Sequence, residues 1–382
     1  MTTPRVLIIA GSDSGGGAGI QADIRTVTML GGHAMTAITA VTAQNTLGVE
    51  AVHAVPADIV VAQIRSVWRD IGVDAVKIGM IGSAETAQAV AAVLEELRGA
   101  KPLSIVFDPV MVATSGSVLA DEATIAAFAR LMALATVTTP NLPELAALGG
   151  EAAVLAHGTA LLAKGGHGAG DVLVDRLIDA SGEVQRWESE RIATTSTHGT
   201  GCTLASAIAT YLAIGKPLGT AVARARQFVR LALHDAPGFG QGHGPMGHHR
   251  VRLDLGAEMR FNQATLPMVD YAASSAFYRT LGLTEIVSTD DGHYARFETP
   301  GGATLSIERD HGPATIYFEC EDLDAEVARL RAAGLGIDSP PEDQSWLWRE
   351  ARLRDPAGNE ICLYQADENR RYPPWRLPTA NA

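Results

Sequence analysis

Short apolar runs that alternate with helical stretches constrain the fold of this chain more than any other feature. Between Arg5 and about Asp235, each run has the length of a strand and is apolar on both faces. Such strands, separated by helices, are typical of a mostly parallel sheet with helices on both sides, so we expect an α/β fold. Strands are expected at 5–11, 75–78, 104–107, 136–138 and 161–164, and helices at 20–30, 84–97, 121–134, 200–214 and 218–234.

Residues that can carry chemistry gather where these strands end. Because ligands of parallel sheets bind outside the carboxyl ends of the strands, their positions predict one ligand site at that edge. The segments concerned are 11–19, 77–80, 108–111, 141–144 and 164–167.

The periodicity changes after a Gly-, His- and Pro-rich stretch at 238–255. Beyond it, a pattern of a helix followed by strands occurs twice, with a repeat of about 50 residues. We expect a smaller α+β domain built from two paired modules. The predicted domains are 1–255 and 256–366, and the Pro-rich, charged residues 367–382 are expected to form a flexible tail.

Composition excludes several classes of protein. The formal net charge of −13 argues against a nucleic-acid surface, which needs clustered Lys and Arg. The sequence contains no run of the roughly 18–20 apolar residues that a membrane span requires. Three cysteines are too few and of the wrong parity for a disulfide framework, so we expect a reducing compartment and a cytoplasmic protein.

Two Gly-rich segments could approach an anion. The segment GSDSGGGAG (11–19) follows the first strand and opens a helix, although a tight turn would have the same composition. The segment THGTGC (197–202) precedes another helix, whose exposed N–H groups and dipole would form an anion hole for a transferring phosphoryl group. The chain has no GxxxxGK[ST] sequence, so a nucleotide would have to be held in another way.

Cys202 lies in the first turn of that second helix. A thiol in this position is expected to have a lowered pKa, so that its thiolate could act as a base. The alternative interpretation is a small buried apolar residue.

The motifs together resemble the hydroxymethylpyrimidine/phosphomethylpyrimidine kinases of thiamine biosynthesis, which belong to the ribokinase-like superfamily. They occur in the order of that family and cover nearly all of residues 5–250. The matching segments are AGSDSGGGAGIQAD (10–23), AVTAQNTLGV (40–49), VKIGMIGS (76–83), VFDPVMVATSG (106–116), TPNLPE (139–144), KGGH (164–167), THGTGCTLASAIA (197–209) and GHGPMGHH (242–249).

The resemblance implies a pyrimidine site and an ATP site. Gln44 would hydrogen-bond the aminopyrimidine edge, and Cys202 would be the base for the substrate hydroxyl in the first of two phosphoryl transfers. The other implied substrate-binding residues are Gly11, Asp23, Met80 and Val110. Lys164, Thr197 and Thr200 would bind the nucleotide, Gly199 and Gly201 would complete the anion hole, and Asp108, Asn141 and Glu144 would organise Mg²⁺.

Two features need separate interpretation. Only 19 residues separate Glu144 from Lys164, which is shorter than the family pattern and predicts an altered sheet edge.

His243, His248 and His249 could suggest a metal site, but they fall in the family motif GHGPMGHH, which favours a structural or substrate-loop role.

Residues 259–366 resemble the vicinal-oxygen-chelate group, which includes glyoxalase I and bleomycin-resistance proteins. The positions that align with metal ligands are Gln263, Ser306 or Glu308, Thr315 and Cys362. Thr and Cys replace the usual His and Glu, so we expect a cup for an unknown small ligand, a dimerisation module or a stability element rather than a metal-dependent enzyme. Trp346 and Trp348 alternate along an expected strand and would share one face, as cup lining or core.

Other functions remain open at the level of sequence. A pyridoxal-type vitamin kinase has the same fold, and Gln44, Met80 and Cys202 favour the pyrimidine over it. A binding or resistance protein with a vestigial kinase is a third possibility, against which the intact motifs argue. Because dimers are common in both families, a homodimer is expected.

Overall fold

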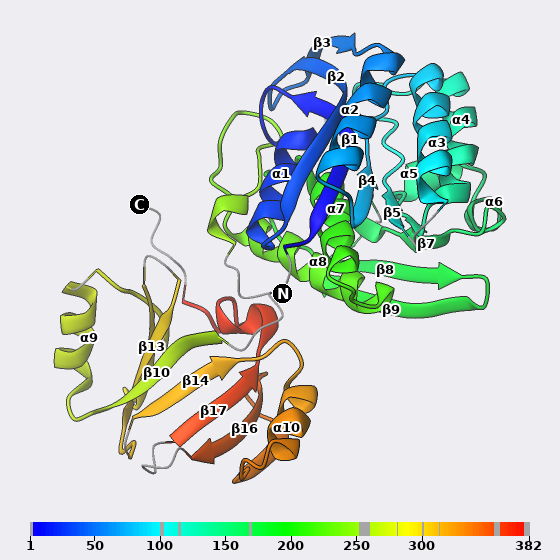
Figure 1. The fold of residues 1–382 in the computed structure, drawn as a ribbon. Helices are drawn as coiled ribbons and strands as arrows, with labels where there is room; N and C mark the ends of the chain where they lie inside the picture. Colours follow the sequence, from blue (N-terminus) through cyan, green and yellow to red (C-terminus); the bar gives the residue numbers. More distant parts are fainter. Residues whose placement is uncertain are drawn as a thin grey trace. The chain divides into compact units, whose positions relative to one another are not determined.

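The computed structural model describes residues 3–99, 103–113, 116–167, 170–251, 260–280, 282–299, 302–312, 314–354 and 360–377. The chain divides into two compact units, Met1–Leu253 and Asp254–Ala382, which we call unit 1 and unit 2 (Figure 1). The boundary expected at residue 255 lies outside the described residues. Within the ranges given above, no helix combines the length and apolarity needed to span a membrane.

Unit 1 is built on a nine-stranded sheet with the order β3-β2-β1-β4-β5-β6-β7-β8-β9. The six strands from β2 to β7 in this order are parallel, and β3, β8 and β9 are antiparallel additions at the two edges. The expected mostly parallel sheet is thus confirmed. The strands are β1 (Arg5–Asp13), β2 (His33–Gln44), β3 (Val49–Ala54), β4 (Ala75–Ile78), β5 (Ser104–Phe107), β6 (Val137–Thr138), β7 (Ala160–Ala163), β8 (Val172–Asp179) and β9 (Gly182–Glu190).

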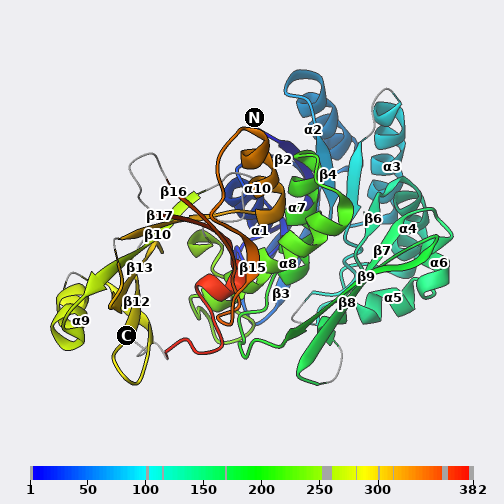
Figure 2. The same ribbon diagram turned by 90° about the horizontal axis from the view of Figure 1, so that it is seen from below.

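Helices cover both faces of this sheet, as Figures 1 and 2 show from two directions. One layer contains α1 (Gly19–Met29), α7 (Thr200–Ala213) and α8 (Leu218–His234), and the other contains α2 (Ala57–Asp70), α3 (Ala84–Arg98) and α4 (Glu122–Leu134). The second layer packs on the side chains of alternate strand residues such as Leu7, Ile9 and Phe107, all fully buried.

The short connection between Glu144 and Lys164 still holds two helices, α5 (Leu142–Ala147) and α6 (Glu151–Leu155). They return the chain so that β7 pairs in parallel with β6, and the hairpin β8–β9 then extends the sheet. Sequence reasoning did not find this hairpin, because β9 is a largely exposed edge strand with the polar sequence GEVQRWESE and no apolar run.

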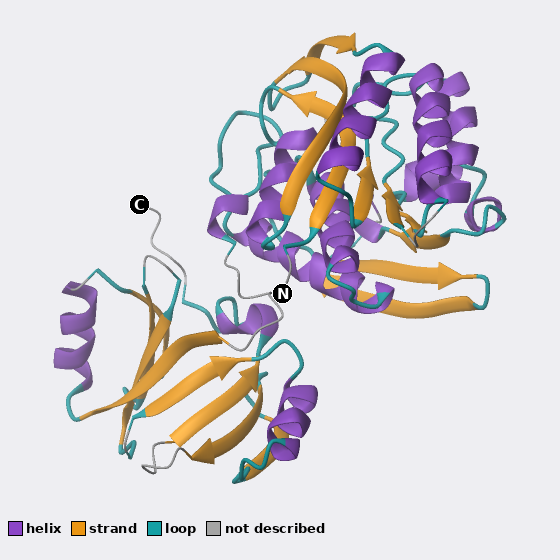
Figure 3. Ribbon diagram, in the orientation of Figure 1, coloured by secondary structure: helices purple, strands orange, loops and turns teal. Residues whose placement is uncertain are grey.

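Unit 2, whose strands and helices Figure 3 distinguishes by colour, has an eight-stranded sheet. The strand order is β11-β12-β13-β10-β14-β17-β16-β15. Each half is one module of a strand, a helix and three further strands, and the antiparallel pair β10–β14 joins the halves. The two expected modules are therefore present. They contain β10 (Arg260–Met268), α9 (Tyr271–Thr280), β11 (Thr284–Ser288), β12 (Tyr294–Glu298) and β13 (Thr304–Arg309), then β14 (Thr315–Glu319), α10 (Leu323–Ala332), β15 (Ser339–Asp343), β16 (Arg349–Arg354) and β17 (Glu360–Gln365).

Trp346 and Trp348 do not share a strand face, so that expectation is wrong. Both precede β16, and Leu347 between them has a positive φ of 65°, which breaks the alternation of a strand. Trp348 is buried and stacks on Tyr364 with ring centroids 4.5 Å apart, whereas Trp346 is 42% exposed.

The flexible tail expected at 367–382 is also wrong for residues 367–377. Arg370, at the end of a short helical turn (Asp367–Arg370), is only 1% exposed. It donates to the carbonyl of Gly302 at 3.1 Å and pairs with Glu319 at 3.3 Å. The backbone N–H of Leu377 donates to the carbonyl of Ile286 at 2.9 Å. The many charged residues of this segment favoured the prediction of a solvent-exposed tail. In the structure, its arginines pair with buried carboxylates. Residues 378–382 lie outside the described part.

Candidate active site

The two Gly-rich segments are pressed together at the carboxyl edge of the unit 1 sheet. Gly199 has φ +84°, and a Cβ there would overlap the carbonyl oxygen of Gly17. A Cβ on Gly17 would in turn lie 2.5 Å from Cδ2 of His198. Only glycine permits this approach of two backbones, so the loop after β1 and the start of α7 form one structure. Neither is an independent tight turn.

The N-terminus of α7 faces a lysine–aspartate pair. The helix begins at Thr200, and its cap residue Gly199 has no side chain to occupy the first N–H groups, which have no acceptor within the helix. A Cβ on Gly201 would lie 3.3 Å from both Lys164 Nζ and Asp108 Oδ2. The structure therefore brings the predicted anion hole and the predicted phosphate-binding lysine together.

Lys164 is held by Asp108. Its Nζ donates to Asp108 Oδ1 at 2.8 Å, and the same oxygen accepts a hydrogen bond from Thr139 Oγ1 at 3.0 Å. Burial opposes the charge of Lys164, but Asp108 and Glu144 outweigh it and raise the pKa of the ammonium. The lysine thus stays charged in a nearly dry position, where a cation interacts strongly with phosphate.

The side chains of Asn141 and Glu144 form hydrogen bonds to backbone N–H groups. They form a capping box at the start of α5, in which Asn141 Oδ1 accepts from Glu144 N at 2.9 Å and Glu144 Oε2 accepts from Asn141 N at 2.8 Å. Burial raises the pKa of the Glu144 carboxyl, and Lys164 opposes that shift. The predicted magnesium residues therefore adjoin the lysine, but two of them already have a structural role.

The donors beside the anion hole are of the kind that Mg²⁺ takes in phosphoryl-transfer sites. No three His, Cys, Asp or Glu side chains in the described ranges are grouped to hold a metal by themselves. Mg²⁺ in phosphoryl-transfer sites keeps several waters and takes only one or two carboxylates together with the substrate phosphates. The carboxylates of Asp108 and Glu144 beside the anion hole fit that requirement.

Asp23 is not at the surface of the site. Its carboxylate is fully buried, pairs with Lys77 Nζ at 2.7 Å and accepts from Ser206 Oγ at 2.7 Å. Burial raises the pKa of Asp23, against the opposing effects of Lys77 and Ser206. The expectation that Asp23 would sit beside the substrate does not hold. It instead ties α1, β4 and α7 together under the site, and sequence reasoning had not assigned Lys77 this role.

Cys202 departs from the expected acidity. Burial raises the pKa of its thiol from an ordinary 9.0 to about 11, with Lys77 opposing the shift and Asp23 and Asp108 adding to it. The expectation of a lowered pKa is wrong, because desolvation and two carboxylates outweigh the helix N-terminus. At pH 7 only about one thiol in ten thousand would be ionised in the protein alone.

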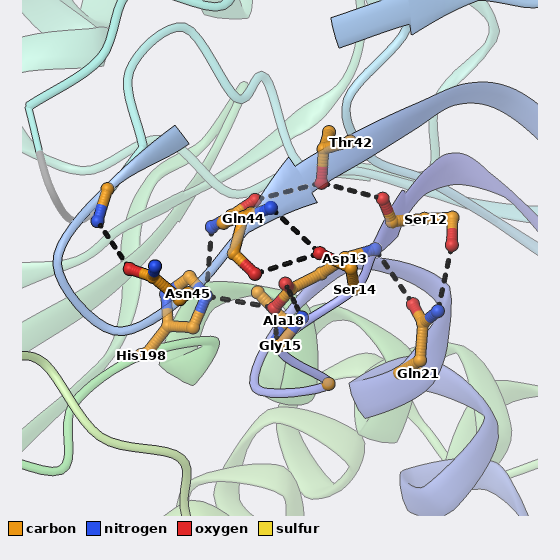
Figure 4. Close-up of polar contacts among 12 residues, drawn as sticks. Ser12, Asp13, Ser14, Gly15, Ala18, Gln21, Thr42, Gln44, Asn45 and His198 are labelled. Atoms are coloured by element: carbon orange, nitrogen blue, oxygen red, sulfur yellow. Dashed lines mark hydrogen bonds and ion pairs between the residues drawn. The ribbon is translucent and has the colours of Figure 1, made fainter. Parts of the chain in front are cut away.

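Gln44 is held by residues from both Gly-rich segments (Figure 4). Its Nε2 lies 3.1 Å from His198 Nε2, which also lies 3.0 Å from Asp13 Oδ2. Asp13 accepts further hydrogen bonds from the backbone N–H groups of Gly15 and Ala18. Burial opposes ionisation of Asp13, but His198 and these N–H groups hold the pKa of its carboxyl below the usual value.

The hydrogen-bond count in this network decides how the Gln44 amide is turned. Thr42 Oγ1 has a single proton, which it donates to Ser12 O at 2.9 Å, so it must accept from Gln44 at 3.3 Å. A proton on His198 Nε2 that is donated to ionised Asp13 likewise needs an oxygen, not an NH₂ group, on Gln44. The amide as drawn in Figure 4 meets neither condition, because its Nε2 faces His198 and its Oε1 faces Thr42. Turning the amide by 180°, so that its oxygen faces His198 and its NH₂ faces Thr42, meets both.

Asp13 and His198 are functional candidates that sequence reasoning missed. Both stand inside quoted motifs, GSDSGGGAG and THGTGC, but they are 185 positions apart and nothing in either motif shows that they meet. The only available signal was that each motif carries an ionisable side chain among its glycines, Asp13 in the first and His198, besides Cys202, in the second.

The remaining predicted residues lie around this centre. Met80 and Val110 are half-buried, and Met80 Sδ would lie 3.2 Å from a Cβ on Gly11. Thr197 Oγ1 lies 3.1 Å from His243 Nδ1. His248 is fully buried, lies 2.8 Å from Thr203 Oγ1, and has its pKa lowered to about 4 by burial. His243 and His248 thus contact the THGTGC segment and α7.

The aligned positions in unit 2 are engaged with neighbouring side chains. Gln263 Oε1 accepts from Thr304 Oγ1 at 2.8 Å, and Thr315 Oγ1 donates to Glu360 at 3.0 Å. Cys362 is fully buried, and burial raises the pKa of its thiol, which keeps it protonated and a poor metal ligand.

A Gly-rich loop, a helix N-terminus and a buried lysine at the carboxyl edge of a mostly parallel sheet give unit 1 the fold of the ribokinase-like small-molecule kinases. The family described as phosphomethylpyrimidine kinase matches residues 13–247, more than half of the chain. The chain therefore belongs to the phosphomethylpyrimidine kinase family. Residues 260–363 match the glyoxalase/bleomycin resistance protein/dioxygenase superfamily, which identifies the class of unit 2.

Individual relatives agree with this assignment. The chain is 48% identical over 264 residues to the thiamine biosynthesis bifunctional protein ThiED of Geobacter sulfurreducens, covering 65% of this chain and 53% of that protein. It is 47% identical over 263 residues to the hydroxymethylpyrimidine/phosphomethylpyrimidine kinase of Streptomyces coelicolor, covering 65% and 95% respectively. It therefore spans about half the length of the ThiED relatives.

Among solved structures, the ADP complex of Bacillus subtilis pyridoxal kinase is similar to unit 1. Its TM-score is 0.58 at 32% identity, with 65% of this chain and 98% of that chain covered.

Lys77→Met should lower the free energy of unfolding by roughly 3–5 kcal/mol, because it leaves the carboxylate of Asp23 buried without a counter-charge. Urea unfolding of the full chain followed by circular dichroism measures this. The double variant Asp23→Asn/Lys77→Met should recover part of the loss. Arg65→Met, which breaks an exposed ion pair with Glu96, is the matched control and should change little. A loss for Lys77→Met no larger than for this control would contradict the role of the buried pair.

Alkylation of Cys202 should reveal its raised pKa. Iodoacetamide at pH 8 should modify Cys202 about 100-fold more slowly than a free cysteine thiol, and the rate should keep rising up to about pH 11. Mass spectrometry of the modified chain measures the rate, and Cys202→Ser corrects for Cys320 and Cys362. A plateau below pH 8 would instead mean that the thiol is acidic, as the helix dipole alone predicts.

Proposed function

We propose that unit 1 transfers phosphate from ATP to the hydroxymethyl group of 4-amino-5-hydroxymethyl-2-methylpyrimidine, and then to the resulting monophosphate. The observation that carries the proposal is the joined pair of Gly-rich segments. One side of this structure holds a carboxamide, Gln44, in a fixed orientation, and the other side presents a helix N-terminus beside Lys164. A recognition group for an aminopyrimidine and a phosphate-binding group are thus parts of one rigid element.

Substrate recognition follows from the turned amide of Gln44. With its oxygen toward His198, the amide retains one N–H and one oxygen lone pair, which complement the adjacent ring nitrogen and amino group of an aminopyrimidine. Met80, Val110 and the backbone of Gly11 would contact the ring. Asp23 acts from below as a positioning residue, through Lys77 and α7.

Phosphoryl transfer requires mainly positioning and neutralisation of charge. Lys164 and the N–H groups at Gly199, Thr200 and Gly201 would hold the transferring phosphate, with Thr197 beside the nucleotide. Asp108, Asn141 and Glu144 would hold Mg²⁺ and its waters, and this ion would neutralise charge on the phosphates. The ADP bound by the B. subtilis pyridoxal kinase supports ATP as the donor.

Cys202 takes a modified role in this scheme. A neutral thiol can accept a hydrogen bond from the substrate hydroxyl and so orient it toward the phosphate. As the hydroxyl oxygen attacks, its proton passes to the sulfur while the thiol passes its own proton to an oxygen of the transferring phosphate, so the sulfur is neutral before and after the step and no preformed thiolate is needed. The second transfer starts from a phosphate oxygen, which carries little or no proton at neutral pH and needs no such help.

A pyridoxal-type kinase is the second candidate, because the structural likeness to the B. subtilis enzyme covers nearly all of that chain. The two candidates differ at the ring edge that faces Gln44. With the hydroxymethyl groups superposed, pyridoxal offers a formyl group where the pyrimidine offers an amino group, and a phenolic oxygen where the pyrimidine offers a ring nitrogen. The expected cytoplasmic location, homodimer and ligand for unit 2 stay predictions.

The decisive assay is ADP formation by the full chain with Mg²⁺-ATP and either hydroxymethylpyrimidine or pyridoxal. We expect turnover of the pyrimidine with kcat/KM at least tenfold above that for pyridoxal, and mass spectrometry should find first the monophosphate and then the pyrophosphate. Lys164→Met is the inactive control. Absence of turnover with the pyrimidine would contradict the proposal, and preferred turnover of pyridoxal would establish the second candidate.

Cys202→Ala should slow the first transfer by about 100-fold and leave the second within a few-fold, since only the first nucleophile carries a proton to be moved. Single-turnover assays started from hydroxymethylpyrimidine and from its monophosphate separate the two steps. Cys320→Ala is the control for loss of a buried thiol. Equal slowing of both transfers would show that Cys202 acts on the phosphate and not on the nucleophile.

A further inference from the structure

One face of the unit 2 sheet is unusually rich in buried charge. On the opposite face, Phe297 and Ile307 form part of a cluster that includes residues of α9, and Ala351 and Leu363 belong to a cluster with α10. Strand alternation therefore places the residues between them on the second face, which we call the polar face. It carries Arg296, Ser306, Tyr317, Glu319, Glu350, Arg352, Cys362 and Tyr364.

Arg296, on β12, is a buried cation of the polar face. It is 5% exposed, and its guanidinium lies 5.3 Å from the centroid of the Trp348 ring. Its Nε has no hydrogen-bond partner, and within the described ranges of unit 2 the structure gives Arg296 neither a hydrogen bond nor an ion pair. Burial lowers the pKa of this group, but a guanidinium stays charged in proteins at neutral pH.

The other arginines near this face all have carboxylate partners. Arg352 pairs with Glu350 at 2.9 Å and with Glu360, and Arg370 pairs with Glu319 at 3.3 Å. Arg371 and Arg376 both pair with Glu298, at 2.6 and 3.3 Å. Each acid in these pairs is therefore engaged by another arginine, and among the described residues of unit 2 Arg296 has no carboxylate partner.

Contact with Trp348 does not compensate Arg296. A cation–π contact acts on the face of the guanidinium, whereas its N–H groups point outward in the plane and need acceptors. An isolated buried charge costs several kcal/mol, and native proteins normally pair it. The same positive charge also disfavours a divalent cation here, because Arg296 is the direct cross-strand neighbour of Ser306, one of the positions aligned with metal ligands.

We propose that the polar face of unit 2 is a binding site for a small organic oxyanion, a carboxylate or a phosphate ester, that pairs with Arg296. Two oxygens of a carboxylate or of a phosphate match the fork of N–H groups that a guanidinium presents. Tyr294 and Trp348 supply aromatic surface beside that group, and Tyr294 is fixed by a 2.8 Å contact between its hydroxyl and Ser306 Oγ. The site lies wholly within unit 2 and does not depend on the kinase activity proposed for unit 1.

The test compares the full chain with Arg296→Met, which keeps the side-chain volume and removes the charge. In calorimetric titrations with phenyl phosphate and with benzoate, at least one of the two anions should bind the unsubstituted protein at least tenfold more tightly than it binds Arg296→Met. A response to phenyl phosphate alone identifies a phosphate ester as the ligand class, and a response to benzoate identifies a carboxylate. Because unit 1 can also bind phosphate, the difference between the two proteins reports the Arg296 site.

Thermal unfolding without ligand provides a second readout. Arg296→Met should unfold at the same or a higher temperature than the unsubstituted protein, since it removes an unpaired buried charge. An anion that binds at Arg296 should raise the midpoint of the unsubstituted protein by more than it raises that of the variant. Arg352→Met, on the same face but paired, is the matched control and should lower the midpoint while keeping the response to anions. A lower midpoint for Arg296→Met, or equal binding by both proteins, would overturn the proposal.

Discussion

The close approach of Gly17 and Gly199 is the constraint on which the rest of unit 1 depends. The two residues belong to segments that follow different strands and open different helices, and a single Cβ on either would separate them. Their contact brings Asp13 and His198 together, and that pair orients Gln44. The same contact sets the N-terminus of α7 beside Lys164, so recognition and phosphate binding share one geometric condition.

Buried charge supports this arrangement from below. Lys77 and Asp23 join β4 to α1, and Ser206 adds α7, which fixes the helix whose first turn carries Cys202. The arrangement has a chemical consequence, because partial burial and two nearby carboxylates keep the Cys202 thiol protonated. The buried groups that fix the position of Cys202 therefore also make its thiol less acidic. In the described part of unit 2 the balance differs, since Arg296 is buried without a carboxylate partner, whereas Arg352, Arg370 and Arg371 each have one.

Much of the fold could be predicted from the sequence because apolar periodicity reports burial directly. The expected ranges of β4, β5 and α8 agree with the structure to the residue, and the two modules of unit 2 were visible as a repeat. Elements without an apolar run were missed, as β9 shows. At 367–377 the error was the opposite one: charged residues led to the prediction of a flexible tail, whereas Arg370 is buried against Glu319. A charged residue is exposed when water is what solvates its charge. When the charge is instead paired with a carboxylate that lies far away in the sequence, the local sequence does not reveal that the residue is buried.

The sequence by itself determined which residue types stand at the carboxyl ends of the strands, and through its motifs it indicated the family and most of the candidate site. Only the tertiary structure decided what those residues do. Asp23, expected beside the substrate, lies in a buried ion pair, and the pKa of the Cys202 thiol is raised where it was expected to be lowered. The contact of His198 with Asp13 and Gln44 was not expected from the sequence. The physical reason is that burial and pairing, which govern both acidity and hydrogen bonding, depend on neighbours brought together by folding and not on neighbours in the chain.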